Sequence, residues 1–274
     1  MENSILNLNK DDLDKLHDVY QNADPFPHIV IDDFLAPDFA ETIASAFDIE
    51  LEEINADFTK SFEGGYGGDK KRQFSPNGCS LDVQLQFARF NGQSFIESLE
   101  RLTGIDGLIG DASYEGGGFH RTTRGGRLGI HADFRVHKRL NLRRELNVII
   151  YLNKTWENAW GGGLELWARD KSSCQKVIYP KFNRCVIFQT DTSSYHGHPL
   201  PLECPEGTAR ISAALYYYTG SKLVYAENSR KTTDYIPGEN VDFSLRERFR
   251  YGFINVLLDY LPPIISRRLL SREK

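Results

Sequence analysis

Two side chains that can bind a metal ion, His131 and Asp133, are separated by a single residue. They follow the apolar run Leu128-Gly129-Ile130, which is typical of a β-strand. In a strand, side chains two positions apart point to the same face. We therefore expect an imidazole nitrogen and a carboxylate oxygen to meet at one point.

A second pair of metal-binding side chains, His196 and His198, begins 65 residues after His131. Two histidines and one carboxylate on one face would leave three positions of an octahedral ion open for other ligands. Non-haem Fe(II) oxygenases have this arrangement, whereas structural zinc sites are closed and rich in sulfur. In an extended segment His196 and His198 would face the same way, so the residues alone leave open which of them is the ligand.

Arg210 lies 14 residues after His196, at the start of the apolar run 211–218. Arg210 and Ser212 would share one face of the expected strand. A guanidinium group can present two parallel donors to one carboxylate. The pattern predicts that Arg210 holds a remote carboxylate of a ligand near the metal.

The elements that must position these residues divide the chain into three predicted parts. Residues 1–107 are expected to form helices over 10–20, about 37–47 and within 82–103, with a strand over 28–31. Residues 108–220 contain short β-like runs separated by glycine, asparagine or aspartate, a pattern typical of a β-sandwich or barrel. Those runs are Leu128–Ile130, Leu146–Leu152, Leu164–Trp167, Lys176–Tyr179, Cys185–Gln189 and Ile211–Tyr218. Residues 221–274 are expected to be a helical tail, so the predicted fold is mainly β with flanking helices.

The composition excludes several classes of protein. With 274 residues, of which 40% are hydrophobic and 26% charged, the chain can bury a core and is too apolar to be disordered. The net charge of −5 makes a nucleic-acid partner a poor expectation. The sequence has neither a run of about 20 apolar residues nor a signal-peptide pattern at its start, so we expect no transmembrane segment. Four scattered cysteines without a C-x-x-C pair agree with a reducing, cytoplasmic location.

Several sequence blocks together resemble the Fe(II)/2-oxoglutarate-dependent dioxygenases, and most closely their prolyl-hydroxylase-like branch. The resemblance covers about residues 108–220 and depends on the order and spacing of the blocks rather than on any one of them. The blocks are His131-x-Asp133, Asn147–Trp156, Gly161–Trp167, Pro180–Phe188, Tyr195-His196-Gly197 and Arg210-x-Ser212. The segment Pro27–Leu35 is similar to the strand with which many members begin.

The resemblance implies a double-stranded β-helix core, also called a jelly-roll or cupin-like core. It implies that His131, Asp133 and His196 bind Fe(II), because the His-Gly pair and the interval to Arg210 favour His196 over His198. Arg210 then matches the residue that pairs with the distal carboxylate of 2-oxoglutarate, supported by Tyr151 and Ser212. With O2, and with ascorbate as a candidate reductant, such an enzyme hydroxylates an unactivated C–H bond and releases succinate and CO2. No catalytic residue beyond the metal centre is implied, and the substrate is expected to be a prolyl or other amino-acid residue, or another small molecule.

Two other functions remain open at this point. The same fold and metal occur in cupin-like enzymes that do not use 2-oxoglutarate, but there a buried Arg210 would lack its anionic partner. A non-catalytic jelly-roll that binds a ligand is the third alternative, and the complete set of metal ligands argues against it. Jelly-rolls carry unrelated functions, so the site must decide.

Four further residues are candidates for binding substrate. Basic residues surround the His131-x-Asp133 segment, and this local charge would attract an anionic substrate or acidic peptide, unless it only forms a solvated face. The candidates are Arg121, Arg143, Arg144 and His198. The glycine-rich segment 63–68 is expected to be a surface loop or a lid. An amphipathic helix over 244–260 is expected to pack on the core, or else to form a dimer contact or a membrane-surface patch.

Overall fold

The computed structural model describes residues 4–53, 58–62, 67–220 and 234–236, with side chains described for 4–47 and 67–220. The predicted helix over 244–260, and with it the dimer contact, lies outside the described residues, as do residues 63–66 of the expected lid. None of the helices in the described part is long and apolar enough to cross a membrane.

The predicted β-core is present, with strands at or around each expected run. The prediction is least accurate at strand ends; for example, the run 128–130 is the end of a strand that begins at Gly118. The strands of this core are β4 (Ile109–Gly110), β5 (Gly118–Ala132), β6 (Arg143–Tyr151), β7 (Leu164–Trp167), β8 (Cys174–Ile178), β9 (Cys185–Gln189), β10 (His196–His198) and β11 (Ala209–Thr219). A further short strand, β12 (Asp234–Ile236), pairs with the end of β5.

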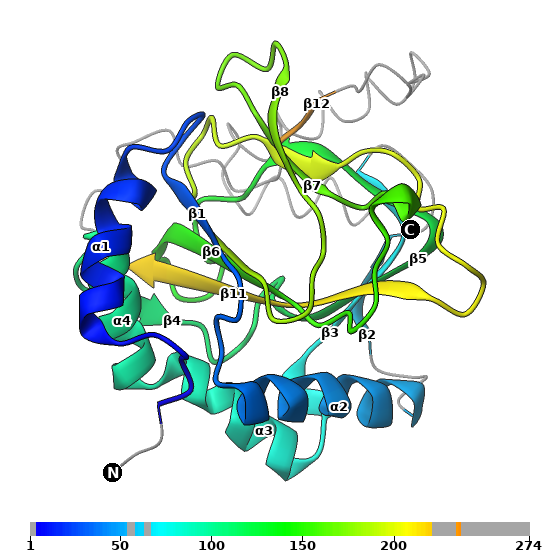
Figure 1. The fold of residues 1–274 in the computed structure, drawn as a ribbon, viewed down its shortest axis with the longest axis horizontal. Helices are drawn as coiled ribbons and strands as arrows, with labels where there is room; N and C mark the ends of the chain where they lie inside the picture. Colours follow the sequence, from blue (N-terminus) through cyan, green and yellow to red (C-terminus); the bar gives the residue numbers. More distant parts are fainter. Residues whose placement is uncertain (1–3, 54–57, 63–66, 221–233, 237–274) are drawn as a thin grey trace, which may run out of the picture.

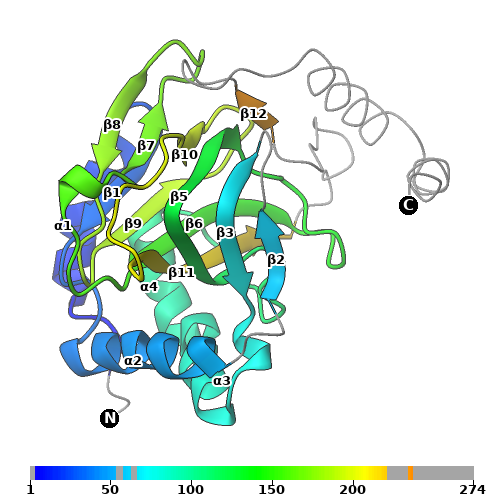
Figure 2. The same cartoon turned by 90° about the vertical axis from the view of Figure 1, so that its right-hand side faces the viewer.

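All strand pairs are antiparallel, in the order β1-β9-β6-β11-β5-β10-β7-β8. The long strand β5 joins the two halves of this sheet, because its first part pairs with β11 and its last part with β10. Between the two pairings lies Gly125, whose φ of +75° is in the region that favours glycine. The sheet therefore curls into a nearly closed barrel (Figures 1 and 2), and the predicted jelly-roll core is confirmed.

The central strands β6 and β9 are buried on both faces, which explains their continuous apolar sequences. On β9, Cys185 and Ile187 pack with the helices, whereas Val186 and Phe188 point into the barrel. The side chains of β6 also alternate between the two faces, and Tyr151 points into the barrel.

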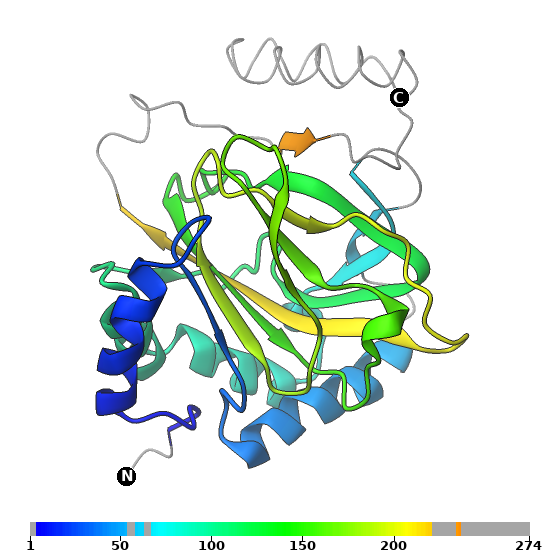
Figure 3. The same ribbon diagram turned by 45° about the horizontal axis from the view of Figure 1, so that its top comes forward.

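In the part of the chain that the structure describes, four α-helices pack outside the barrel. The helices α1 (Lys10–Gln21) and α4 (Gln93–Thr103) lie along one side, while α2 (Pro37–Glu53) and α3 (Leu81–Ala88) lie across the bottom of the strands in Figure 1, and Figure 3 shows α2 running beneath the barrel. Three short 3-10 turns complete the elements, over Pro76–Gly78, Arg89–Asn91 and Asn158–Trp160. The helix predicted to end near residue 47 continues to Glu53, since neither glycine nor proline interrupts it there.

The N-terminal part supplies strands as well as helices. The predicted strand β1 (His28–Ile31) pairs with β9. The sequence did not predict the hairpin of β2 (Phe58–Phe62) and β3 (Gly68–Phe74), whose second strand pairs with β5. The sequence of β3 is charged and therefore does not indicate a strand, although Lys71 and Gln73 are buried. The division of the chain at residues 107 and 220 into separate units stays a prediction.

Candidate functional site

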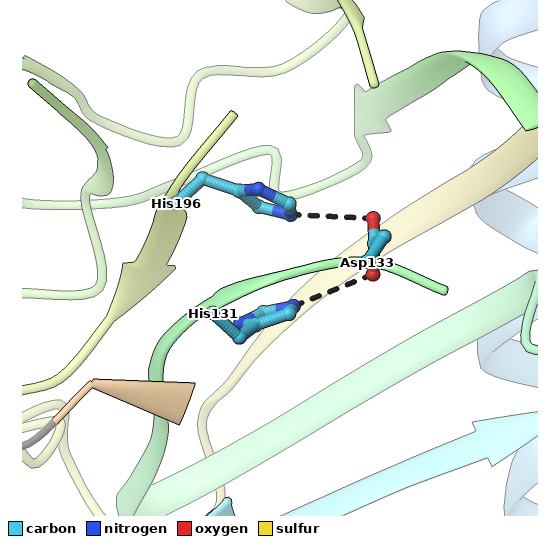
Figure 4. A group of neighbouring side chains, drawn as sticks. All are labelled: His131, Asp133 and His196. Atoms are coloured by element: carbon cyan, nitrogen blue, oxygen red, sulfur yellow. Dashed lines mark ion pairs between the residues drawn. The ribbon is translucent and has the colours of Figure 1, made fainter. Parts of the chain in front are cut away.

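The barrel brings His131, Asp133 and His196 together, as the sequence predicts. His131 lies near the end of β5, opposite His196 in the register of β10, and Asp133 follows directly after β5. The ligand atoms of the three side chains all lie within 4.8 Å of one another. Figure 4 shows the two imidazoles pointing at different oxygens of Asp133, each at 3.5 Å from Nε2 to oxygen.

A close approach of two backbones makes this convergence possible. A Cβ on Gly197 would lie 2.6 Å from the carbonyl oxygen of Gly129 and 2.8 Å from that of Leu128. Between His196 and His198 the pairing with β5 also shifts by one residue, which is a β-bulge. Gly197 is therefore required for β10 to lie close enough to β5.

Both imidazoles are fixed by a hydrogen bond to the backbone two residues earlier. Nδ1 of His131 lies 2.7 Å from the carbonyl oxygen of Gly129, and Nδ1 of His196 lies 3.0 Å from that of Ser194. When Nδ1 carries the proton, Nε2 is the free acceptor that a metal needs. Burial, together with His131, lowers the pKa of His196 to about 4, which keeps this ring neutral at physiological pH.

Asp133 is held from behind by two buried side chains. Arg144 Nη2 lies 3.0 Å from Oδ2 of Asp133, and Asn147 Nδ2 donates to the same oxygen at 2.7 Å. Arg144 is itself fully buried and stacks on the ring of Tyr216, with its guanidinium carbon 3.4 Å from the ring centre. Burial alone would raise the pKa of Asp133, but Arg144 and the two histidines hold it well below its ordinary value. The carboxylate is thus ionised and turned so that Oδ1 is available to a metal.

Two of the predicted carboxylate-binding residues, Arg210 and Ser212, line the same pocket, and the third, Tyr151, contacts Arg210. Arg210 Nη2 donates to the hydroxyl of Tyr151 at 3.0 Å, and its Nε donates to the carbonyl oxygen of Gly162 at 2.8 Å. Ser212 lies opposite Tyr151 in the register of β6 and β11, and it lines the same pocket. Burial raises the pKa of Tyr151, so its hydroxyl stays protonated. Within the described residues, no acidic side chain lies within ion-pair distance of Arg210.

The donors present fit both groups that the resemblance implies. Two imidazole nitrogens and one carboxylate oxygen suit Fe(II) and leave positions open for other ligands. At the other end, a buried guanidinium that bonds only to neutral groups suits the distal carboxylate of 2-oxoglutarate. His198 adds buried ring nitrogens without a hydrogen-bond partner on the same pocket.

The candidate substrate residues are scattered. Arg121 lies on the outer face of β5, where it lines an open groove of about 590 Å³ with Lys70 and Arg124, and Arg143 pairs with Glu145 outside the pocket. The prediction for Arg144 assumed an exposed side chain, and the structure instead buries it against Asp133. His198 lines the pocket, but it is not among the three residues that converge on one point. Substrate binding by these four residues stays a prediction.

Several pocket residues were not found from the sequence. Asn147 contacts Asp133, and three polar side chains from β3 and β5 form one wall of the same pocket. These three are Lys71, Gln73 and His120. Asn147 could have been predicted, because it shares a face of β6 with Tyr151. Lys71 and Gln73 could not, because the sequence does not indicate that β3 is a strand.

Comparisons with known proteins agree with this site. Residues 117–218 match the family model of the 2OG-Fe(II) oxygenase superfamily, and this segment contains all of the predicted metal and cosubstrate residues. A search of curated proteins by sequence found no match.

Three solved structures illustrate the shared fold. A prolyl 4-hydroxylase from Pseudomonas putida is 15% identical, with 76% of this chain and 99% of that chain covered and a TM-score of 0.53. A prolyl hydroxylase from Trichoplax adhaerens, in complex with a peptide of hypoxia-inducible factor, is 16% identical, with 76% and 90% covered and a TM-score of 0.55. SnoK, a non-haem α-ketoglutarate-dependent carbocyclase from nogalamycin biosynthesis, is 12% identical, with 85% and 95% covered and a TM-score of 0.52.

At these identities the structural likeness establishes the fold, and the family model supplies the family. The double-stranded β-helix expected from the sequence is confirmed. Residues 117–218 match the 2OG-Fe(II) oxygenase superfamily, and the site within this segment takes Fe(II) as cofactor and 2-oxoglutarate as cosubstrate.

Proposed function

We propose that this oxygenase hydroxylates an unactivated C–H bond of a prolyl or other amino-acid residue and releases succinate and CO2. The observation that supports it most directly is the pairing, in one pocket, of the His131–Asp133–His196 cluster with the buried Arg210. The cluster suits the metal and Arg210 suits the diacid, so one reaction uses both.

Each of the chain's own residues has a defined task in this proposal. Bound Fe(II), with 2-oxoglutarate and O2, supplies the oxidising chemistry. His131 and His196 present Nε2, because backbone carbonyls hold their Nδ1 atoms. Arg144 and Asn147 keep Oδ2 of Asp133 occupied and so direct Oδ1 to the metal. Arg210 and Tyr151, with Ser212 beside them, orient the cosubstrate.

The wall formed by Lys71, Gln73 and His120 supports a substrate that carries a polar or anionic group next to the reacting carbon. A peptide is the class we favour, since the Trichoplax relative is described in complex with one. Fold alone does not select the reaction, because a carbocyclase shares it.

The test is anaerobic reconstitution with Fe(II) and then 2-oxoglutarate, followed by the visible metal-to-ligand charge-transfer band. His131→Ala should abolish the band and Arg210→Ala should require far more 2-oxoglutarate to produce it. Succinate release in air would then be measured with proline-containing peptides and with free amino acids. Bound iron without a band would favour a cupin-like enzyme, and absence of iron binding would favour a non-catalytic binding module.

A further inference from the structure

Among the described residues, His198 differs from other buried histidines in having no hydrogen-bond partner. His28, His131 and His196 each place Nδ1 within 3.0 Å of the carbonyl oxygen two residues earlier in the chain. His198 is equally buried, with 3% of its surface exposed, but neither of its ring nitrogens has a hydrogen-bond partner. An imidazole left in this state costs free energy unless a ligand satisfies it.

The position of His198 indicates which ligand that is. It lines the pocket that also contains Arg210 and Ser212. Lys71, on β3, is a second cation that lines this pocket. A ligand group that lies between these side chains must therefore be an acceptor, and an anion fits best.

The residues that the structure describes supply no such anion. Among the described residues that line the pocket, Asp133 is the only acidic one, and its Oδ2 already accepts from Arg144 and Asn147. Thr122, opposite Arg210 in the register of β5 and β11, has a buried hydroxyl that also lacks a partner. Unsatisfied polar groups thus flank Arg210 from two strands.

We propose that His198 is a cosubstrate-binding residue whose imidazole donates a hydrogen bond to the distal carboxylate of 2-oxoglutarate, beside Arg210. The inference rests on the proposed function, since it takes the bound diacid to be 2-oxoglutarate. It assigns a different role to each histidine of the His196-Gly197-His198 segment: His196 serves the metal and His198 the far end of the cosubstrate.

The test compares His198→Leu with His28→Leu, which removes a histidine that is just as buried but bonded to Phe26 and outside the pocket. Removing an unsatisfied imidazole should leave the thermal midpoint of the ligand-free protein unchanged or raised, whereas His28→Leu should lower it. The anaerobic charge-transfer titration should show the affinity of His198→Leu for 2-oxoglutarate reduced by about tenfold or more, and that of His28→Leu unchanged.

Oxalate distinguishes the two ends of the cosubstrate, because it can chelate the metal but has no distal carboxylate. Its affinity for the Fe(II) protein, measured by competition, should be equal in wild type and His198→Leu. The inference is overturned if His198→Leu binds 2-oxoglutarate as tightly as wild type, if oxalate and 2-oxoglutarate weaken equally, or if the ligand-free variant is destabilised as much as His28→Leu. A wild-type protein that binds iron but no 2-oxoglutarate would instead overturn the proposed function, and this inference with it.

Discussion

Two buried arginines line the same pocket, and they differ in what neutralises their charge. Arg144 is paired with Asp133 at 3.0 Å and is also bonded to Asn147. Among the described residues, Arg210 donates only to neutral oxygens, those of Gly162 and Tyr151. A charge that the chain neutralises internally belongs to the architecture of the site, whereas one that it leaves to a ligand defines what the site binds.

Replacing Arg144 should give the largest effect on stability. Arg144→Met leaves the carboxylate of Asp133 buried without its counter-ion, so the metal-free protein should lose about 3–5 kcal/mol of unfolding free energy. Urea unfolding of the metal-free protein measures it. The matched control is Arg101→Met, because both side chains of the Arg101–Asp14 pair are exposed, at 43% and 51%. That variant should lose about 1 kcal/mol or less of unfolding free energy. Equal losses in the two variants would show that the buried pair contributes no more to stability than an exposed one.

Arg210 should behave in the opposite way. Arg210→Met removes a charge that has no counter-ion among the described residues, so it should destabilise the ligand-free protein by clearly less than Arg144→Met. Its loss should appear in binding, where truncating one partner of a buried charge pair costs about 2–5 kcal/mol of affinity for 2-oxoglutarate. Unfolding and charge-transfer titration of the same preparation separate the two effects. A ligand-free Arg210→Met as unstable as Arg144→Met would mean that Arg210 is structural.

Replacing Asn147 tests whether the side chains that hold Asp133 contribute to metal affinity. Asn147→Leu removes the 2.7 Å bond to Asp133 and should lower Fe(II) affinity by about 10- to 100-fold. Anaerobic competition with a chromophoric chelator measures this affinity. Asn153→Leu is the matched control, because Asn153 is also buried but bonds to the backbone of Ala209 and Ile211. It should lower stability without changing metal affinity, and an equal change in both would show a general effect of damage to the fold.

The sequence predicts the fold well where strand patterns are apolar and poorly where they are charged. The strands β6, β9 and β11 are buried on both faces, so their apolar runs identify them. The sequence Gly68–Phe74 of β3 contains three consecutive basic residues, and nothing local shows that Lys71 points into a barrel. The direction of Lys71 follows only from the pairing of β3 with β5, and that pairing is a long-range contact.

Site residues are predicted where side chains alternate regularly between the two faces of a strand, and they are missed where a bulge interrupts this alternation. Two-residue spacing relates His131 to Asp133 and Arg210 to Ser212 correctly. It cannot relate His131 to Thr122 on the same strand, because the glycine bend at Gly125 and the register shift near Leu128 intervene. The burial of Arg144 was not predictable either, since a run of basic residues usually indicates a solvated surface.

An exposed ion pair of the same chemistry should give the smallest effect. Asp32 accepts from Arg184 Nε at 2.6 Å and from Lys181 Nζ at 2.8 Å, but its side chain is 37% exposed. The hydrogen bond from Arg184, helped by Lys181, lowers the pKa of Asp32 from 3.8 to about 2. Since the folded value lies below the unfolded one, this contribution to stability is present above pH 3.8 and is lost as the pH falls towards 2.

Asp32→Asn should therefore cost about 1 kcal/mol or less at neutral pH, and still less in high salt. Thermal unfolding of both proteins at decreasing pH should show the difference between them shrink below pH 3.8 and vanish near pH 2. A cost at neutral pH as large as that of Arg144→Met would show that pairing alone sets the energy of these contacts. A small cost would show that burial determines the energy of these contacts. Arg144 and Arg210 are both buried, whereas the side chain of Arg184 is 23% exposed.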